Sequence, residues 1–447
     1  MMRLFHKPTI LLCFVCSLMA IFLCGCNHSE SNEEAFEATT NNSNAASESR
    51  PHSYSLSVTG NALGKSIIDY GGCSSHGYYS SILWPDEMYS ENSPWIHISN
   101  ITYVDYDTRE MIFLCNVPGC AHNTEDCSSF IKYPNSIILF MDIREENLFC
   151  MALGALNGEV YSDEDLGRIY KMNPDGSNRT ELIKLDPSES FSIEDPILSD
   201  DENLYVCKYI MKGKNEYIKG LFRINIETGK TEEIMEMDTS TFVLGTFEGR
   251  AVILVNRSNR DDPEYRITDI YNKSVIVDKK LGGNNNSYIY GTLRFDYVIS
   301  GDVGSLIIHD MVTDKERVVE DIPARTSSNI ALYEPYDNHI IWSYSDRETG
   351  EDSEYIVDLD RLSYTKNSLM ANGLYGFEQF YSIVGMNDSY YLVISNVTQR
   401  KLQLTNQDGV DYECSIDLWP EYGLLLKQDY WDSIDNIELI DDFTTYE

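Results

Sequence analysis

Three cysteines and one histidine lie close together in the stretch "FLCNVPGCAHNTEDCSSF", which runs from Phe113 to Phe130. Their spacing is C-x4-C-x-H-x4-C, and the members of this Cys/His cluster are Cys115, Cys120, His122 and Cys127. Three thiolates and one imidazole form a complete ligand set for tetrahedral zinc. Because such a set leaves no open coordination position, a metal bound here would be structural rather than catalytic.

The same cluster allows two other interpretations, which stay open at this point. Exported proteins often oxidise their thiols, so one disulfide with a spare cysteine is an alternative, and three packed thiols are another. Seven cysteines follow Cys26, and because that number is odd at least one of them has no partner within the chain. The spacing is not one of the common zinc-finger spacings, although Pro118 and Gly119 provide a turn just before Cys120.

We predict no catalytic residue. The chain contains no HExxH, GxSxG, P-loop or helix-opening GxGxxG motif. His97, His309 and His339 lie in strand-like runs and are expected to be hydrogen-bonded sheet residues. A Cys73–His76 pair lacks an identifiable third group to orient it. The 72 acidic residues are too numerous to single out a catalytic pair, and most are expected to be loop acids in contact with solvent.

The N-terminus indicates export. Arg3 and Lys7 precede the uncharged apolar run Ile10 to Leu23, which has the length of a signal-peptide core rather than of a membrane span. The run ends in "LCGC", which resembles a bacterial lipobox. This resemblance implies cleavage after residue 25 and diacylation of Cys26, which anchors the chain to the extracytoplasmic face of the cell membrane. An uncleaved N-terminal anchor helix is the alternative.

Residues 26–52 are rich in Ser, Asn, Glu and Ala and show no hydrophobic period. We therefore predict a disordered tether that spans roughly 25–30 Å on average. The remaining residues, 53–447, are expected to form the folded body. The formal net charge of −38 excludes nucleic acid as a partner and favours solubility. We expect a monomer.

The body of the chain repeats one pattern. Short runs of β-branched and aromatic residues alternate with polar turns, and a Gly-, Asn- or Asp-containing turn recurs every 40 to 53 residues or so. This period matches one four-stranded blade, so we predict an all-β protein: a β-propeller of about seven blades, within a range of six to eight. Two stacked sandwiches are the alternative. The recurring turns are Asp175-Gly176, Thr228-Gly229, Asn272-Lys273, Thr313-Asp314 and Asp360-Arg361.

The predicted units have explicit boundaries. They are residues 53–135, 136–187, 188–238, 239–284, 285–325, 326–372 and 373–440. The first and last units are irregular, and the first contains the Cys/His loop at 115–127. We therefore expect the cluster to lie where the ring must close without a regular hairpin.

The segment "GRIYKMNPDGSNRTELI" (residues 167–183) is similar to the TolB-type propeller repeat, and "GLFRINIETGKTEEI" is a degenerate copy. Together with the lipobox and a C-x-x-P-x-C-x-H…C signature, the chain resembles bacterial surface lipoproteins of Gram-positive, clostridial type with a TolB-like propeller. The resemblance implies a fold and a location but no activity.

The leading functional hypothesis is a membrane-anchored scaffold that binds a ligand or a protein at the cell envelope, without catalysis. One alternative is a surface glycan-processing hydrolase with two carboxylates facing each other in the propeller channel, 5–9 Å or so apart. Another is a sensor or assembly factor of an envelope complex. A structural zinc ion is the one cofactor that the residues suggest, and an envelope protein or a glycan is the expected partner.

Overall fold

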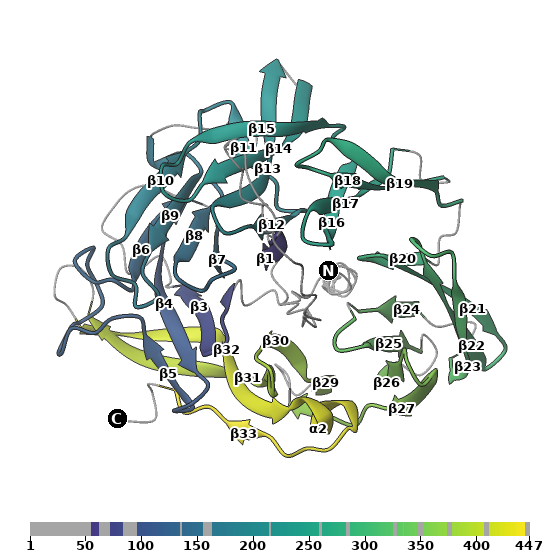
Figure 1. The fold of residues 1–447 in the computed structure, drawn as a ribbon. Coiled ribbons are helices and arrows are strands. Elements are labelled where there is room, and N and C mark those ends of the chain that lie inside the picture. Colours follow the sequence, from purple (N-terminus) through teal and green to yellow (C-terminus); the bar gives the residue numbers. More distant parts are fainter. Residues whose placement is uncertain are drawn as a thin grey trace, which may run out of the picture.

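The computed structural model is a ring of β-sheets (Figure 1). It describes residues 55–61, 72–83, 96–134, 136–154, 163–213, 216–258, 262–282, 287–324, 329–333, 335–346, 352–372, 378–405 and 411–442. The predicted signal peptide, the lipid attachment site Cys26 and the predicted tether lie outside these residues. The helices among the described residues are too short or too polar to cross a bilayer.

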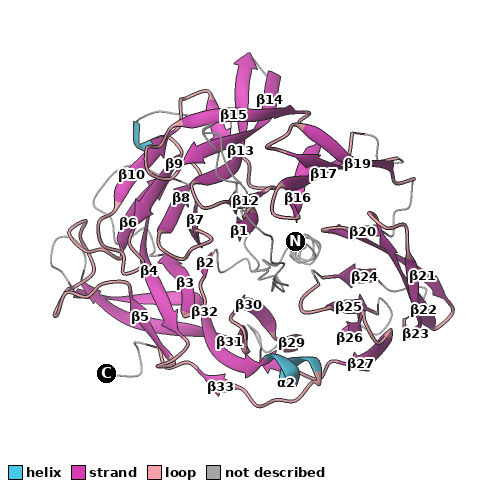
Figure 2. Ribbon diagram, viewed as in Figure 1, coloured by secondary structure: helices cyan, strands magenta, loops and turns pink. Residues whose placement is uncertain are grey.

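Within the described residues, seven sheets of four or more strands follow one another around the ring in chain order. This confirms the predicted all-β propeller and its number of blades. Neighbouring strands within each blade are antiparallel, and Figure 2 shows that strands make up nearly all of the regular structure.

The strands of blades 1 to 3 have the following bounds. Blade 1 contains β2 (Gly72–Cys73), β3 (Gly77–Leu83), β4 (Ile96–Asp105), β5 (Glu110–Phe113) and β6 (Phe130–Pro134). Blade 2 contains β7 (Ile137–Met141), β8 (Leu148–Ala152), β9 (Arg168–Met172) and β10 (Thr180–Lys184), with the short helix η3 (Asp163–Asp165) before β9. Blade 3 contains β11 (Glu189–Phe191), β12 (Pro196–Ser199), β13 (Asn203–Gly213), β14 (Glu216–Asn225) and β15 (Thr231–Met237).

Blades 4 to 7 complete the ring. Blade 4 contains β16 (Thr241–Phe247), β17 (Ala251–Asn256), β18 (Glu264–Asp269) and β19 (Ser274–Lys280). Blade 5 contains β20 (Ser287–Tyr290), β21 (Leu293–Ser300), β22 (Val303–Asp310) and β23 (Glu316–Pro323). Blade 6 contains β24 (Asn329–Leu332), β25 (His339–Ser345), β26 (Asp352–Asp358) and β27 (Ser363–Lys366). Blade 7 contains β30 (Ser382–Met386), β31 (Tyr390–Thr405), β32 (Asp411–Leu426) and β33 (Glu438–Leu439), with α2 (Lys427–Trp431) before β33. A small hairpin, β28 (Met370–Asn372) and β29 (Glu378–Phe380), precedes blade 7.

Burial falls from the inner strands of a blade to its outer strand. In blade 2, β7 and β8 are buried at every position, whereas β10 is exposed or half-buried throughout. Cores form between blades: Phe140 and Phe149 of blade 2 belong to one cluster with Ile197 and Phe222 of blade 3. Each sheet thus buries its apolar face against the next sheet, which is why the repeats assemble into a ring.

The recurring turns predicted from the sequence join the third and fourth strands of blades 2 to 6. In several of them an Asp or Asn at the end of the third strand accepts backbone N–H bonds from residues two and three positions later. Asp310 accepts such bonds from Val312 and Thr313 at 2.9 and 3.0 Å. Gly229 has a φ of 67°, the left-handed conformation for which glycine is suited.

One predicted boundary is wrong. Residues 53–135 were expected to form one blade, but β1 (Ser57–Asn61) pairs with β12 and so extends the sheet of blade 3 toward the centre of the ring (Figure 1). Strand β12 offers an unpaired inner edge, and β1 satisfies its backbone groups. Leu56, just before β1, is buried in a core shared by blades 3 and 4. Gly60 lies so close to Phe140 that a Cβ atom at residue 60 would approach the Phe140 Cβ to 2.9 Å.

The direction of β1 defines two faces of the ring. Because β1 runs antiparallel to β12, its first residue lies beside Ser199, just before the turn to β13. The N–H of Leu56 also donates to the carbonyl of Gly249, in the turn between β16 and β17, at 2.8 Å. We use the name turn face for the side of the ring that contains two kinds of turn: those between the first and second strands of the blades, counted from the centre, and those between the third and fourth. The opposite side is the distal face. The chain enters the ring from the turn face.

Candidate metal centre

The Cys/His cluster lies in a loop that interrupts the outer strand of blade 1. Strand β4 pairs with β5 along residues 102–105 and with β6 along residues 96–100, so the two short strands follow one another on the same edge. Residues 114–129 leave the sheet between them. Cys115 comes two residues after β5, and Cys127 comes three residues before β6.

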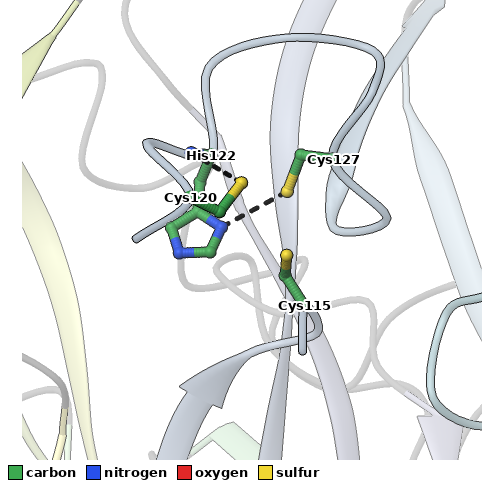
Figure 3. A group of neighbouring side chains, drawn as sticks. All are labelled: Cys115, Cys120, His122 and Cys127. Atoms are coloured by element: carbon green, nitrogen blue, oxygen red, sulfur yellow. Dashed lines mark hydrogen bonds between the residues drawn. The ribbon is translucent and has the colours of Figure 1, made fainter. Parts of the chain in front are cut away.

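The four side chains converge (Figure 3). One ligand atom from each residue, three Sγ atoms and a histidine ring nitrogen, lies within 4.8 Å of all the others. His122 Nδ1 and Cys127 Sγ lie 3.3 Å apart. Cys115 reaches the centre from the end of the strand, whereas the other three reach it from the loop. No disulfide joins the described cysteines.

Local backbone geometry produces this convergence. Gly119 has a φ of 72° and His122 a φ of 53°, so the chain turns sharply on both sides of Cys120. The backbone N–H of His122 consequently donates to Cys120 Sγ at 3.4 Å. The His122 ring packs against the Phe113 ring with a centroid distance of 4.5 Å and an interplanar angle of 33°, which orients its imidazole.

A polar shell that the sequence did not reveal supports the cluster. The Asn100 side-chain amide donates to the His122 carbonyl at 3.0 Å and to Ser129 Oγ at 2.8 Å. Ser129 Oγ in turn lies 3.1 Å from Cys127 Sγ. Asn100 and Ser129 are both buried, so these contacts hold the loop in one conformation. Their spacing from the cysteines shows no motif, because the contact depends on how β4 passes behind the loop.

The thiols differ in acidity. Burial raises the pKa of Cys120 to about 11, and the Cys127 and Cys115 thiols beside it act in the same direction. Burial also opposes ionisation of Cys127, but hydrogen bonds from Ser129 and from the two neighbouring thiols outweigh it and lower the pKa of Cys127. Cys127 therefore becomes a thiolate at a lower pH than Cys120 does.

The cluster lies against the joint that closes the ring. Cys127 belongs to a buried core with Val104 and Phe130 of blade 1 and with Leu424 and Trp419 of blade 7. Cys73, Cys115 and Cys120 pack on the same core. The structure thus places the Cys/His cluster where the first and last blades meet.

The other chemically suggestive residues have structural surroundings. His309 lies between Asp296 and Glu316, with N–O distances of 3.1 and 3.2 Å, and His339 Nδ1 lies 2.7 Å from the Asp337 carbonyl oxygen. Both are strand residues with partners, as predicted, whereas the side chain of His97 lies outside the described part of the structure.

Two acidic residues, Asp105 and Asp200, form turns. Asp105 accepts N–H bonds from Asp107 and Thr108 at 2.8 Å each, and Asp200 accepts them from Glu202 and Asn203 at 2.9 and 2.8 Å. One oxygen of each carboxylate is therefore used by the turn, and Asp200 Oδ2 also accepts hydrogen bonds from the hydroxyls of Tyr205 and Tyr271.

The carboxylate pair required by the hydrolase alternative is not found on the innermost strands. Among the described residues, the innermost strands β2, β7, β12, β16, β20, β24 and β30 read GC, IILFM, PILS, TFVLGTF, SYIY, NIAL and SIVGM, without a single Asp or Glu. The strand β1, at the centre of the ring, has none either.

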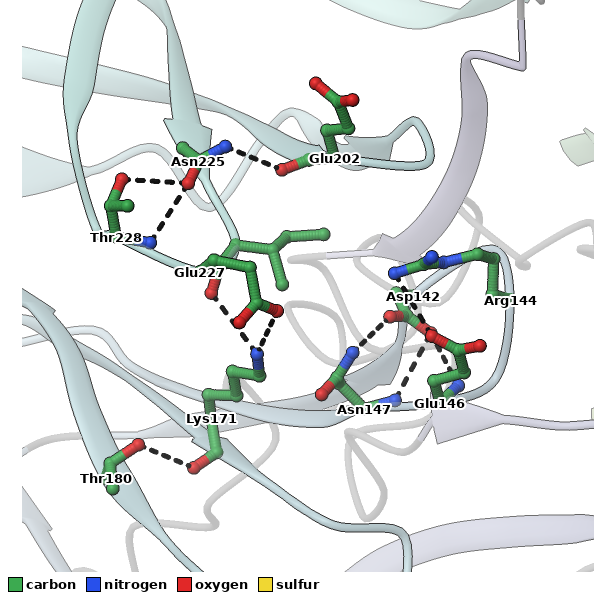
Figure 4. A network of polar contacts seen from close by, with 11 residues as sticks. Asp142, Arg144, Glu146, Asn147, Lys171, Thr180, Glu202, Asn225, Glu227 and Thr228 are labelled. Atoms are coloured by element: carbon green, nitrogen blue, oxygen red, sulfur yellow. Dashed lines mark hydrogen bonds and ion pairs between the residues drawn. The ribbon is translucent and has the colours of Figure 1, made fainter.

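A polar cleft of about 360 Å³ lies on the turn face between blades 2 and 3 (Figure 4). An ion pair crosses it, with Lys171 Nζ 2.6 Å from Glu227 Oε1. Thr180, Glu181 and Thr228 are among the residues that line the rest of the cleft. Hydroxyl, amide and carboxylate groups are the polar groups that this cleft offers to a ligand.

No protein-family model matches the chain, and no curated protein is significantly similar to it. Among solved structures, the chain is similar to an oligogalacturonate lyase in complex with manganese, at 11% identity and a TM-score of 0.41, over 79% of this chain and 98% of the lyase. It is also similar to the β-propeller domain of the Trilobed protease from Pyrococcus furiosus, at 9% identity and a TM-score of 0.43, over 87% and 99% of the two chains. An acylaminoacyl peptidase matches at 9% identity and a TM-score of 0.43, but the match covers 53% of its length and 84% of this chain. At these scores the similarities carry no argument about activity, so the β-propeller assignment rests on the sheet topology.

Proposed function

We propose that this chain is an extracytoplasmic lipoprotein whose propeller is a scaffold for binding a ligand or a protein at the cell envelope. Residues 1–25 act as the signal peptide, Cys26 carries the lipid, and residues 26–52 tether the ring to the membrane. The net negative charge of the chain repels nucleic acid, so the partner is of another class.

The observation that supports this proposal best is the path of β1. The chain enters the ring from the turn face, since Leu56 bonds to Gly249 and Ser57 pairs with Ser199. A tether that reaches roughly 25–30 Å therefore leads from the membrane to this face. In the proposed arrangement the turn face, which contains the cleft between blades 2 and 3, is directed toward the membrane, and the distal face is directed toward partner proteins outside the cell.

The cleft between blades 2 and 3 is the proposed position for a small polar ligand of the scaffold. Its volume of about 360 Å³ is at the lower end for sites that bind small molecules. The Lys171–Glu227 ion pair neutralises the one cation among its lining residues, so the remaining groups suit a neutral, hydroxyl-rich ligand such as a glycan.

Metabolic labelling tests the anchoring. The full chain is expressed in a Gram-positive host with an alkyne analogue of palmitate, and lipid label and membrane association are measured. We expect the wild type and Cys24→Ser to carry the label and to sediment with membranes. We expect Cys26→Ser to lose the label. Membrane retention of an unlabelled, unprocessed wild-type chain would refute the lipoprotein proposal in favour of an uncleaved anchor helix.

A further inference from the structure

We propose that the Cys/His cluster binds one zinc ion as a closed structural site that holds the joint between blades 1 and 7. This inference is independent of the lipoprotein proposal, because it rests on residues within the ring. It concerns the three sulfur atoms and the imidazole that converge in Figure 3.

The distances fit zinc. Zn–S and Zn–N bonds of about 2.3 and 2.0 Å place the ligand atoms of a tetrahedral site about 3.5–3.8 Å apart. In this chain all four ligand atoms lie within 4.8 Å of one another, and His122 Nδ1 and Cys127 Sγ are 3.3 Å apart. A small inward movement of side chains suffices to complete the tetrahedron.

The donor set selects the metal. Three thiolates are soft ligands that favour zinc over magnesium and calcium, which prefer oxygen. The carboxylates that hard cations require are not part of the cluster. Because four protein ligands fill the tetrahedron, the bound ion has no position for water, and its role is structural.

The residues around the cluster preorganise it for metal binding. The N–H of His122 donates to Cys120 Sγ, which stabilises a metal-bound thiolate. Asn100 holds the His122 carbonyl, and Ser129 contacts both Asn100 and Cys127 Sγ. These hydrogen bonds from Asn100 and Ser129 fix the orientation of the ligands before the metal binds.

The position of the cluster gives the ion its structural consequence. Cys115 follows β5 and Cys127 precedes β6, so one ion fastens both halves of the interrupted outer strand to each other. The loop is then fixed on the core that Trp419 and Leu424 of blade 7 share with blade 1. The zinc ion would thus stabilise the closure of the ring.

Metal analysis on the purified full chain, solubilised in mild detergent, tests the proposal. We expect one zinc per chain by mass spectrometry, and at least a tenfold loss of zinc in His122→Ala and in Cys115→Ser. The matched control is Cys73→Ser, which removes a thiol that packs on the same core without belonging to the cluster, and it should retain the full zinc content.

Cobalt binding reports the coordination geometry in the wild-type chain, so this test does not depend on whether any variant folds. The wild-type chain, reduced and stripped of metal, is titrated with Co²⁺ and then with Zn²⁺. We expect the intense visible bands of tetrahedral cobalt with thiolate-to-metal charge transfer, and their replacement on addition of one equivalent of zinc. Less than a tenth of an equivalent bound to the reduced chain, or a disulfide among the cluster cysteines in the protein as isolated from the envelope, would overturn the proposal.

Discussion

Two joints of the ring are held in different ways. Between blades 3 and 4, which are consecutive in the chain, Lys219 Nζ lies 2.6 Å from Asp195 Oδ2, and both side chains are fully buried. The ammonium donates to the carbonyl of Thr241, and Asp195 accepts the N–H of Val243, so the pair bonds to the backbone of the first strand of blade 4. Between blades 1 and 7, an apolar core and the Cys/His cluster lie beneath exposed polar contacts.

The difference follows from the chain. Blades 3 and 4 are joined by a turn of a few residues, so the buried ion pair of blade 3 can bond directly to the adjacent first strand of blade 4. Blades 1 and 7 are formed by opposite ends of the sequence that folds into the ring, and bringing them together costs more loop-closure entropy. Here the long β31–β32 hairpin of the last blade contributes Val397 and Trp419 to the core of the first. The contact between blades 1 and 7, which no short connection in the chain holds together, is therefore stabilised by a large buried apolar area and, as we propose, by a metal ion.

The largest effect is expected from removing the proposed metal, because the binding energy of a structural zinc ion is folding energy. Chelation under reducing conditions should raise amide hydrogen exchange at least tenfold in peptides that cover residues 110–134 and 438–442. Peptides that cover β14 and β16 should be unchanged. Equal protection of both joints with and without chelator would show that the cluster contributes nothing to ring closure.

Lys219→Met should weaken the other joint, between blades 3 and 4. It leaves the Asp195 carboxylate buried without its cation, at a cost of about 3–5 kcal/mol of unfolding free energy. Asp195 raises the pKa of Lys219 above its ordinary value although burial opposes this, so the lysine is charged in the fold. Denaturant unfolding measures the loss.

The double variant Asp195→Asn, Lys219→Met is the control for that loss. Because it removes both charges, its cost should be smaller than the sum of the two single changes. Strict additivity would mean that the ion pair does not couple the residues of this joint.

Glu354 tests a third joint, between blades 6 and 7, where a carboxyl group is buried and pairs with no cation among the residues that the structure describes. Burial raises the pKa of Glu354 to about 8, and Asn367 Nδ2 donates to Glu354 Oε2 at 3.1 Å. The unfolded glutamate loses its proton near pH 4.5. Between these two values the folded protein binds a proton that the unfolded chain lacks, so the free energy of unfolding falls as the pH rises from 4.5 to 8.

Glu354→Gln should remove this fall, which is on the order of 2–4 kcal/mol between pH 5 and pH 8. Chemical denaturation at a series of pH values, for the wild type and the variant, measures it. The neighbouring groups Asp352, Tyr333 and Tyr430 remain in both proteins, so they cancel in the difference. Parallel pH profiles for the two proteins would contradict the assignment of the effect to Glu354.

The smallest effect is expected at the surface of the closing joint. Arg109 pairs with Glu438, but both side chains are more than 40% exposed. Arg109→Ala should therefore change the unfolding free energy by less than about 1 kcal/mol. The backbone bonds from Met111 to Asp441 and from Asp441 to Arg109, at 2.8 and 2.9 Å, remain in the variant. A larger loss in thermal or denaturant unfolding would mean that the rim, rather than the core, closes the ring.

Much of the architecture was predictable because propeller repeats are local. The period of the turns predicted the blades, and Asp175-Gly176 and Thr228-Gly229 lie in third-to-fourth-strand turns as the sequence indicated. The sequence also predicted the members of the Cys/His cluster and the irregularity of the first blade. Asn100 and Ser129 were not predicted, because their contacts to the cluster depend on the packing of β4 against the loop.

Two features could not be predicted from the sequence: the pairing of β1 and the Lys219–Asp195 ion pair. "SVTGN" is compatible with a strand, but its partner is more than 130 residues away, and the short pattern contains nothing that selects blade 3. Asp195 is one of 72 acidic residues, and only burial at a joint distinguishes it from a loop acid.

By itself the sequence determined the class of fold, the repeat and the four residue types of the candidate metal centre, because strand periodicity, turn chemistry and ligand chemistry are properties of short segments. The tertiary structure decided which segments meet: β1 with blade 3, the interrupted outer strand with blade 7, and Lys219 with Asp195. Those contacts join residues that are distant in the chain or undistinguished in type. Their stability comes from burial, and burial exists only once the ring has closed.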